Sequence, residues 1–290
     1  METSDAVRKN FEEKASYLAR LMPGMSVIEQ ESFLLVDSGV ASDTFNVLVA
    51  RTLSDPAPLI RNGVDYFLQK RLPMALWYWE DTIDAADLRT LLDYGLTTNE
   101  IDVAMVADLE EANLQVTLPT ELTIKLVENP EELQEFANVL VRLFGNSAEA
   151  QGVAAYFQQL RHFAAEQFPD MRYYIGLYQN QVVATGTLFV GSETIGIYDI
   201  VTDERFRRKG IGSAMFAHLL NEAGRWGRRY AVLQASSDGI GIYARAGFRA
   251  AGNVHVFENR SAGCENDGAQ CRPRLDRDAD AAFRQWAAIA

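Results

Sequence analysis

A basic, glycine-containing stretch at residues 206–214 has the composition of a phosphate-binding turn. It reads Phe-Arg-Arg-Lys-Gly-Ile-Gly-Ser-Ala and lies between an expected strand and an amphipathic helix. The glycines let the backbone turn tightly and approach a ligand closely. The first amides of the helix lack intrahelical acceptors and carry the positive end of its dipole, so they can bind a pyrophosphate. The cations that would balance its charge are Arg207, Arg208 and Lys209.

Two better-known phosphate motifs do not fit this stretch. The P-loop pattern Gly-x4-Gly-Lys-Ser/Thr is absent from the sequence. A dinucleotide fingerprint would need a glycine or alanine at position 215, which is a methionine. The remaining alternative is a plain helix start with a solvated basic run.

A second motif lies about 30 residues further on, and the two together resemble the GNAT N-acetyltransferase superfamily. Arg207-x-x-Gly210-x-Gly212 matches the Arg/Gln-x-x-Gly-x-Gly/Ala signature of that family's coenzyme A site. The stretch Ile-Tyr-Ala-Arg-Ala-Gly-Phe at 242–248 matches its Leu-Tyr-x-x-x-Gly-Phe. The resemblance covers about residues 121–258 and implies acetyl-CoA as co-substrate, without a metal.

The resemblance also implies which residues hold the coenzyme. The strand before the turn would bind the pantetheine arm through the backbone of Ile200, Val201 and Thr202. The amides of the turn would bind the pyrophosphate, namely those of Arg208, Lys209, Gly210, Ile211, Gly212 and Ser213. Glu204 stands where many members have proline, which we expect to matter little.

Direct acyl transfer needs a group that takes the amine proton and one that protonates the departing sulfur. In the family, the tyrosine that matches Tyr243 is the acid, and its ordinary pKa near 10 keeps it protonated at neutral pH. Asp199, one residue before the pantetheine segment, is the candidate base. The alternatives are a tyrosine and a carboxylate with packing roles only. A water relay could also replace the base, because the strand at 230–235 holds no carboxylate.

The elements that position these residues follow from hydrophobic period and turn signals. After Pro119, the expected order is β-α-α-β-β-β-α-β-α-β. Strands are expected near 122–126, 173–178, 182–190, 194–202, 230–235 and 248–257, and helices near 130–144, 153–168, 210–224 and 240–246. The predicted class is α/β (α+β), with a mixed, mostly antiparallel GNAT-type sheet flanked by helices. An N-terminal GNAT-like α/β domain precedes it.

Residues 1–120 are predicted to form that accessory domain, 121–258 the catalytic domain and 259–290 a polar, flexible tail. Helices are expected at about 7–21, 63–72 and 84–94, and strands at 32–36, 44–50 and 74–79. This half resembles the degenerate GNAT-like half of tandem bacterial members and lacks the glycine turn. The cluster Trp77-Tyr78-Trp79 is interpreted as core, or alternatively as a substrate wall between the domains.

Charge and composition exclude several classes of protein. The 290 residues carry a net charge of −13, and the first 120 hold 9 basic and 20 acidic residues. Such a chain is a poor nucleic-acid binder, and no apolar run reaches the length of a membrane span. The acidic half slightly favours a cationic acceptor, with solubility as the alternative. Cys264 and Cys271 are the only cysteines, and His162, His218 and His255 do not cluster, so no disulfide scaffold or metal site is expected.

We therefore expect a cytoplasmic N-acetyltransferase that moves the acetyl group of acetyl-CoA to an amine, either a small molecule or a peptide or protein amino group. A homodimer is compatible with the sequence. Two alternatives stay open. One is a non-catalytic acyl-CoA sensor, and the other is a protein-interaction module built on an aromatic face of the N-terminal half.

Overall fold

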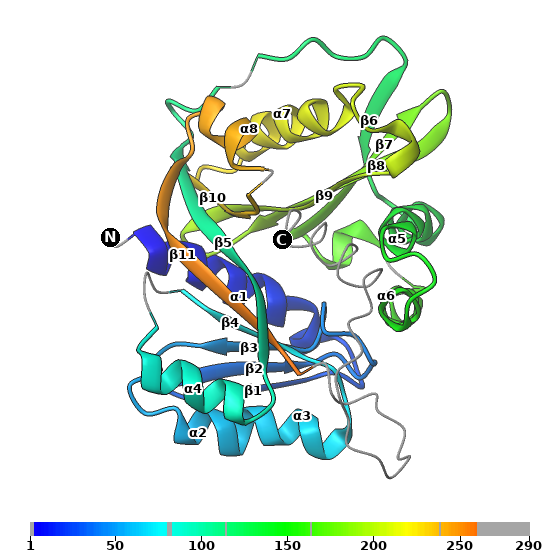
Figure 1. The fold of residues 1–290 in the computed structure, drawn as a ribbon. Helices are drawn as coiled ribbons and strands as arrows, with labels where there is room; N and C mark the ends of the chain where they lie inside the picture. The colour runs from blue at the N-terminus through cyan, green and yellow to red at the C-terminus, as the bar shows by residue number, and fades with distance from the viewer. Residues whose placement is uncertain (1–2, 80–82, 114, 163, 238, 260–290) are drawn as a thin grey trace.

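The computed structural model of the chain describes residues 3–79, 83–113, 115–162, 164–237 and 239–259. The predicted tail lies outside these residues except for Asn259. Within the described residues, eleven strands form one mixed sheet in the order β1-β2-β3-β4-β11-β5-β10-β9-β8-β7-β6. Figure 1 shows that this sheet runs through both halves of the molecule.

The first half begins with a helix and ends with a long strand. Its strands are β1 (Ser26–Glu29), β2 (Phe33–Asp37), β3 (Val47–Ala50), β4 (Ala75–Tyr78) and β5 (Thr97–Asp108). Its helices are α1 (Thr3–Leu21), α2 (Ala57–Leu59), the π-helical η1 (Ile60–Val64), α3 (Asp65–Lys70) and α4 (Ala85–Asp93). All six elements predicted for this half are confirmed, whereas β1 and β5 are absent from the sequence prediction.

The second half has the predicted order of strands and helices. Its strands are β6 (Leu122–Leu126), β7 (Met171–Tyr178), β8 (Gln181–Val190), β9 (Thr194–Thr202), β10 (Tyr230–Ala235) and β11 (Arg249–Glu258). Its helices are α5 (Pro130–Leu143), α6 (Ala148–Gln159), α7 (Ile211–Ala223), α8 (Ile240–Arg245) and the short 3-10 turns η2 (Ala165–Gln167) and η3 (Glu204–Phe206).

One predicted helix, at 153–168, is misplaced. The structure has α6 from Ala148 to Gln159, because Ser147 caps it by accepting a hydrogen bond from the Ala150 amide at 3.1 Å. Phe168 is buried although it follows the helix, so its apolar side chain extended the predicted periodicity too far. Because α6 ends at Gln159, His162 lies in an exposed turn rather than in the predicted helix.

Strands β5 and β11 join the two halves. β5 belongs to the first half but lies between β10 and β11 and pairs antiparallel with both. β11 belongs to the second half and lies between β5 and β4. Both long strands descend side by side in Figure 1. The sheet therefore continues across the predicted boundary at residue 120, and removing the first half would take a central strand out of the second.

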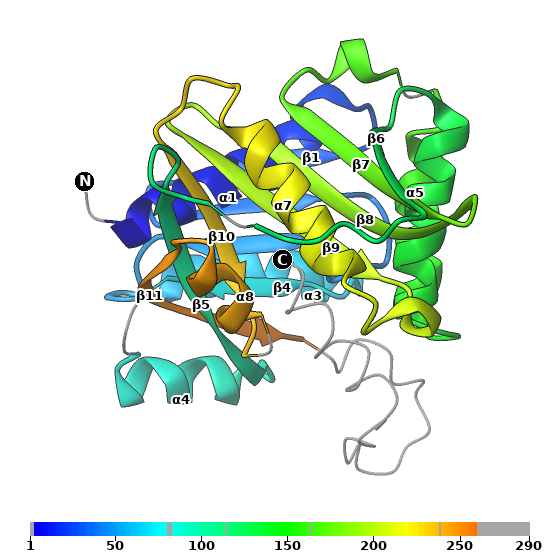
Figure 2. The same cartoon turned by 90° about the horizontal axis from the view of Figure 1, so that it is seen from above.

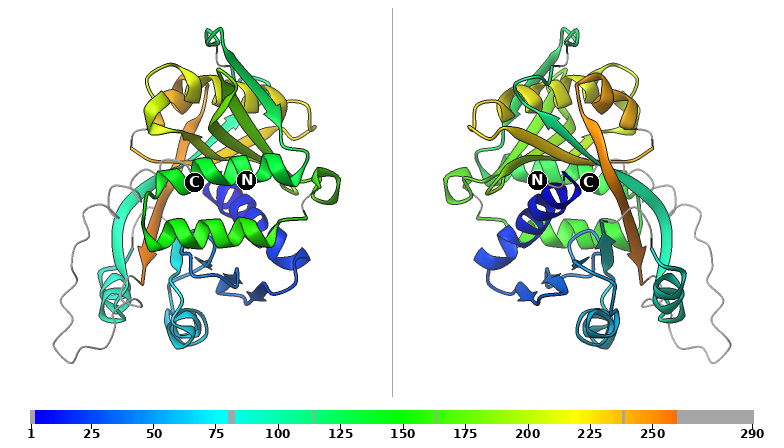
Figure 3. Two further views of the ribbon diagram at one scale, coloured as in Figure 1. Left: turned by 90° about the vertical axis from the view of Figure 1, so that its right-hand side faces the viewer. Right: turned by 90° about the vertical axis from the view of Figure 1, so that its left-hand side faces the viewer.

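The helices form three layers that pack against the faces of this sheet. Figure 2 shows α7 lying across β8 and β9, with α8 beside it. On the opposite face, α1, α5 and α6 lie between the second half's strands and β1–β4, and Figure 3 shows α5 and α6 side by side along one flank. Helices α2 to α4 cover the outer face of β1–β4.

The middle layer holds the largest apolar cluster, which includes Trp77 of β4 and Trp79 directly after it, whereas Tyr78 packs on the opposite face in the cluster under α2 to α4. Trp77 and Trp79 pack against Phe11 of α1 with ring centroids 4.7 and 5.0 Å away. Trp77, Tyr78 and Trp79 are all buried. The interpretation of this cluster as core is confirmed, and it offers no exposed aromatic face to a protein partner.

Candidate active site

The turn between β9 and α7 is held in place by a buried carboxylate. Asp203 accepts hydrogen bonds at 2.8 Å from Arg142 Nε of α5 and at 2.8 Å from the Arg205 guanidinium. Its other oxygen caps η3 by accepting from the Arg205 amide at 3.1 Å. These bonds lower the pKa of Asp203 to about 2, with the Arg205 hydrogen bond as the main cause. The carboxylate therefore fixes the start of the turn to the sheet and to α5.

The turn leaves the first amides of α7 without backbone acceptors. Gly210 precedes the helix with φ of 78°, a left-handed conformation that favours glycine. Among the described residues, the first amide of this helix that finds a backbone acceptor is that of Ala214, which donates to Gly210 O at 3.0 Å. The preceding amides, from 208 to 213, have no backbone acceptor within the described part of the chain, and open amides at a helix start can donate hydrogen bonds to the oxygens of an anion.

The three predicted cations surround this turn unequally. Arg207 is partly buried and its Nε donates to the Thr202 carbonyl at 3.2 Å, so it ties the turn to β9. Arg208 and Lys209 are exposed beside Gly210. Lys209 Nζ lies 5.1 and 5.2 Å from the ring centres of Tyr178 and Phe206. Two cations are thus available at the mouth of the turn.

Strand β9 has a free edge where the resemblance places the pantetheine arm. β9 and β10 run parallel and pair only from Thr194 to Gly196. Beyond Gly196, no pairing of β9 with β10 occurs within the described residues, although β8 continues to pair on the other side up to Thr202. The backbone of Ile200, Val201 and Thr202 therefore lies on an edge that an extended ligand can pair with.

A bulge in the same strand turns Asp199 toward the opposite face. The β8–β9 register shifts between Thr185 and Thr187, and Asp199 there has φ of 54°. Thr185 Oγ1 donates to the Asp199 carbonyl at 2.8 Å and so supports the bulge. A non-glycine residue in this conformation stores strain that is common at functional sites.

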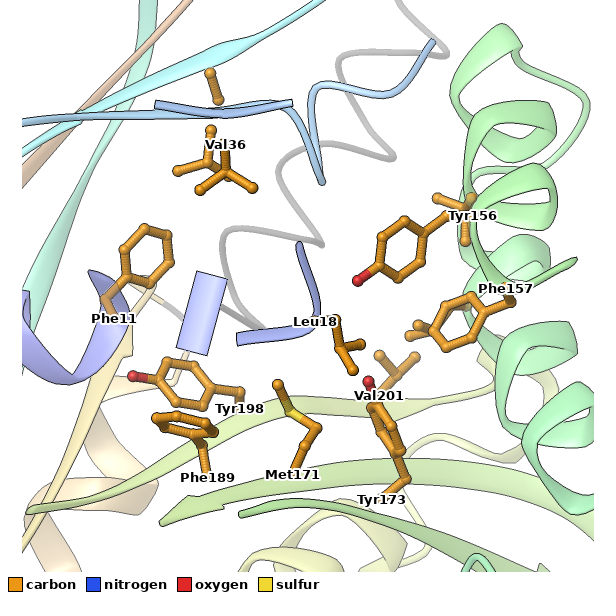
Figure 4. Close-up of a cluster of buried hydrophobic side chains, with 14 of the residues drawn as sticks. Phe11, Leu18, Val36, Tyr156, Phe157, Met171, Tyr173, Phe189, Tyr198 and Val201 are labelled. Atoms are coloured by element: carbon orange, nitrogen blue, oxygen red, sulfur yellow. The ribbon is translucent and has the colours of Figure 1, made fainter. Parts of the chain in front are cut away.

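Asp199 lines a cavity of about 50 Å³ between the two halves of the molecule. The other lining residues come from α1, β2, β3, α5, α6 and β7 and from loops of the first half, and they are mostly apolar or aromatic. Phe45 of the first half stacks on Tyr156 of α6 at 3.6 Å between ring centroids. Figure 4 shows Tyr156 and Tyr173 projecting from α6 and β7 into the space between the halves.

Charges and hydroxyl groups meet in this cavity. Lys14 Nζ of α1 lies 3.7 Å from Asp199 Oδ1. Burial, together with the charge of Asp199, raises the pKa of Tyr156 and Tyr173 above the ordinary value of a phenol. Both phenols therefore stay neutral at physiological pH and can donate or accept hydrogen bonds.

Tyr243 lies on the other side of the sheet, with the glycine turn. Its ring contacts Phe216 of α7 edge-on at 4.8 Å and Phe248 at 6.3 Å. Gly239 permits this placement, since a Cβ there would lie 2.8 Å from the Tyr243 ring. Burial, with a smaller effect of the Asp102 charge, raises the pKa of Tyr243 to about 12. The phenol is therefore protonated over the whole physiological range.

Comparison with known proteins agrees with this geometry. Residues 134–248 match the family model of the acetyltransferase (GNAT) family. This segment is a GNAT domain. Its matched range contains the glycine turn, the free edge of β9 and Tyr243. None of the curated proteins compared with the chain matches it.

Solved structures share the fold over nearly the whole chain. A GCN5-related N-acetyltransferase from Kribbella flavida superposes with a TM-score of 0.61 at 15% identity, over 86% of this chain and 95% of its own. A tandem GNAT protein from the clavulanic acid biosynthesis pathway gives 0.51 at 11% identity, over 90% and 97%. The predicted class, a mixed GNAT-type sheet flanked by helices, is confirmed. The first half repeats the parallel crossover of the GNAT domain, since β3 pairs parallel with β4 as β9 does with β10.

The structure adds residues that sequence reasoning missed. Lys14 reaches the GNAT domain from α1, and Asn10 of the same helix docks it there. Asn10 Nδ2 donates to the Thr194 carbonyl at 2.9 Å, and its Oδ1 accepts from the Tyr198 hydroxyl at 2.7 Å. A helical spacing of apolar residues carries no sign of such contacts. Asp203 was also overlooked, although its place as an N-cap before Glu-Arg-Phe is a recognisable signal.

The described ranges also bear on the expectations about metals and membranes. None of their helices combines the length and apolar character that a bilayer crossing demands. They contain no group of three His, Cys, Asp or Glu side chains placed to share a metal ion. His162, His218 and His255 lie in a turn, in α7 and in β11, and both cysteines fall outside the described residues.

Asp203→Asn is expected to reduce the free energy of unfolding by about 2 kcal/mol at pH 7. The folded-state pKa is about 2 against an ordinary value of 3.8, and each pH unit between them is worth about 1.4 kcal/mol. Because the folded pKa is the lower one, this stabilisation is present above pH 4 and disappears as the pH falls toward 2. Urea unfolding from pH 7 to pH 3 measures it. The variant Glu204→Gln, at an exposed neighbour, should behave as wild type; an equal stability of Asp203→Asn at pH 7 would contradict the anchoring role.

Proposed function

We propose that this protein transfers the acetyl group of acetyl-CoA to a primary amine bound in the cavity between its halves. One observation carries the proposal: a single strand, β9, serves two sites. Its edge at 200–202 is free toward the glycine turn, and its bulge at Asp199 opens into the cavity on the opposite face. A reaction at the gap between β9 and β10 would join the two.

The residues present suit coenzyme A. The open amides at 208–213 and the exposed Arg208 and Lys209 offer donors and positive charge for a pyrophosphate. The free edge at 200–202 offers backbone groups to the pantetheine amides. When bound there, acetyl-CoA supplies a reactive thioester.

The chain's own residues then supply the proton transfers. The Asp199 carboxylate takes a proton from the acceptor's ammonium group, which leaves a neutral amine able to attack. The Tyr243 hydroxyl donates its proton to the sulfur as the carbon–sulfur bond breaks, and its high pKa keeps that proton available. The new bond joins the amine nitrogen to the acetyl carbon, and the second proton that this nitrogen loses restores the Tyr243 phenol.

The direct test is release of the coenzyme A thiol by the full-length protein, with acetyl-CoA and a panel of primary amines. We expect thiol release that depends on the amine, together with an N-acetylated product seen by mass spectrometry. Binding of acetyl-CoA without turnover on any amine would favour a sensor instead. Since β5 completes the GNAT sheet, the experiment needs both halves of the chain.

Asp199→Asn is expected to lower kcat at least 100-fold and to leave acetyl-CoA binding within twofold of wild type. Asparagine tolerates the positive φ at this position, so the bulge should survive while the proton acceptor is lost. Assays of coenzyme A thiol release measure kcat, and equilibrium titrations measure acetyl-CoA binding. An unchanged kcat would rule out Asp199 as the base and favour a water relay.

A further inference from the structure

The cavity beside Asp199 carries one negative and one positive side chain within otherwise apolar and hydroxyl-bearing walls. Asp199 and Lys14 come from opposite halves, and their side chains are 11% and 16% exposed. The distance of 3.7 Å between Lys14 Nζ and Asp199 Oδ1 allows attraction but is too long for a hydrogen bond. Each group therefore retains hydrogen-bonding capacity for a third partner.

This pair constrains the charge of the acceptor. A simple cationic amine at Asp199 would bring a second positive charge next to Lys14 in a poorly solvated space. A ligand with its own carboxylate avoids that repulsion, because each charge on the ligand meets its opposite on the protein. The complex then remains neutral overall.

We propose that the acceptor is a neutral α-amino acid, whose α-ammonium contacts Asp199 and whose α-carboxylate contacts Lys14. The inference rests on the proposed acetyl transfer, which requires an amine at Asp199. The side chain would face apolar lining residues, among them Val36, Leu140 and Met171. The stacked rings of Phe45 and Tyr156 lie among the same walls.

The walls of the cavity limit the charge of the side chain. The lining is mostly apolar or aromatic, so a neutral side chain avoids burying a third charge beside Asp199 and Lys14. The transfer balances as follows: the amino nitrogen bonds to the acetyl carbon, and the carbon–sulfur bond breaks. The nitrogen loses two protons, one to Asp199 and one that replaces the proton Tyr243 gives to the sulfur. The products are an N-acetyl amino acid and coenzyme A.

The test compares alanine with alaninamide, which lacks the carboxylate but keeps the amine and the methyl group. Isothermal titration of the full-length protein saturated with coenzyme A should show alanine binding at least 30-fold more tightly. The rate of acetyl transfer should follow the same order, although the amine of alaninamide loses its proton more readily. Equal or tighter binding of alaninamide would overturn the proposal, as would equal use of alanyl-alaninamide, which would make peptide amino termini the acceptors.

Variants of Lys14 test whether its side chain causes the preference for alanine over alaninamide. Lys14→Met should abolish the preference for alanine over alaninamide, and Lys14→Arg should restore most of it, since both keep a long side chain in α1. Lys9→Met is the matched control, because Lys9 lies on the same helix and pairs with the exposed Glu193 instead. A Lys14→Met variant that folds and keeps the full preference would refute the assignment.

The outcome also separates this inference from the proposed function. If the protein bound the coenzyme and acetylated amines but did not prefer those with a carboxylate, acetyl transfer would stand and only the amino-acid acceptor would be ruled out. Absence of coenzyme binding and of turnover on every amine would remove both.

Discussion

Gly210→Glu should weaken acetyl-CoA binding at least 100-fold. The substitution places a carboxylate at the amides that are expected to hold the pyrophosphate, and unit charges about 4 Å apart repel by about 4 kcal/mol at an effective dielectric constant of 20. A 100-fold loss corresponds to about 2.7 kcal/mol, well within that range. Equilibrium titration of the coenzyme on the full-length variant measures the change.

The chain offers a close control for backbone strain. Gly227 follows α7 in a loop, has φ of 68° and, like Gly210, has open space around the position of a Cβ. Gly227→Glu therefore introduces the same charge and a similar left-handed strain at the other end of the helix. It should lose about as much stability as Gly210→Glu but bind acetyl-CoA normally. Normal coenzyme binding by Gly210→Glu would contradict the pyrophosphate site.

Tyr243→Phe should lower kcat by about 100-fold and change the dissociation constant of acetyl-CoA less than twofold. The substitution removes the hydroxyl that would protonate the sulfur but keeps the ring contacts with Phe216 and Phe248. Steady-state kinetics and coenzyme titration separate the two quantities. Tyr174→Phe, in the same apolar cluster, is the control and should keep wild-type kcat.

The raised pKa of Tyr243 adds a pH signature to this variant. The folded-state pKa is about 12 against an ordinary value of 10, so the neutral phenol is stabilised in the folded protein. This contribution is complete below pH 10 and is lost as the pH rises from 10 to 12. Wild type should therefore lose stability more steeply than Tyr243→Phe in that interval. If Tyr243→Phe kept the kcat of wild type and lost stability between pH 10 and 12 as steeply as wild type does, the role of this residue as the acid would be contradicted.

Local signals in the sequence predicted the GNAT domain well. The glycine turn, the helix near 130–144 and the alternating strands depend on contacts within a few residues, and the structure has all of them. Family membership followed from two motifs separated by about 30 residues. The positions of Tyr243 and of the turn on one face of the sheet are consistent with those motifs.

Contacts between distant segments could not be predicted. The sequence did not predict β5 because burial in this strand runs against side-chain polarity. The apolar Ile101 is 52% exposed, whereas the charged Asp102 is fully buried. Nothing local indicates that a strand of the first half completes the sheet of the second. The pairing of Lys14 with Asp199 depends on that same arrangement. The bulge that turns Asp199 into the cavity has no recognisable sequence signal.

The most direct test of the central claim, that the glycine turn and the free edge of β9 bind acetyl-CoA, is thermal unfolding of the full-length protein with and without the coenzyme. At 100 times its dissociation constant, a ligand stabilises the folded state by about 2.7 kcal/mol. For a chain of 290 residues this raises Tm by about 4 °C. That increase, absent in Gly210→Glu and present in Gly227→Glu, is the predicted result. An unchanged Tm of the wild-type protein at saturating acetyl-CoA would contradict the account.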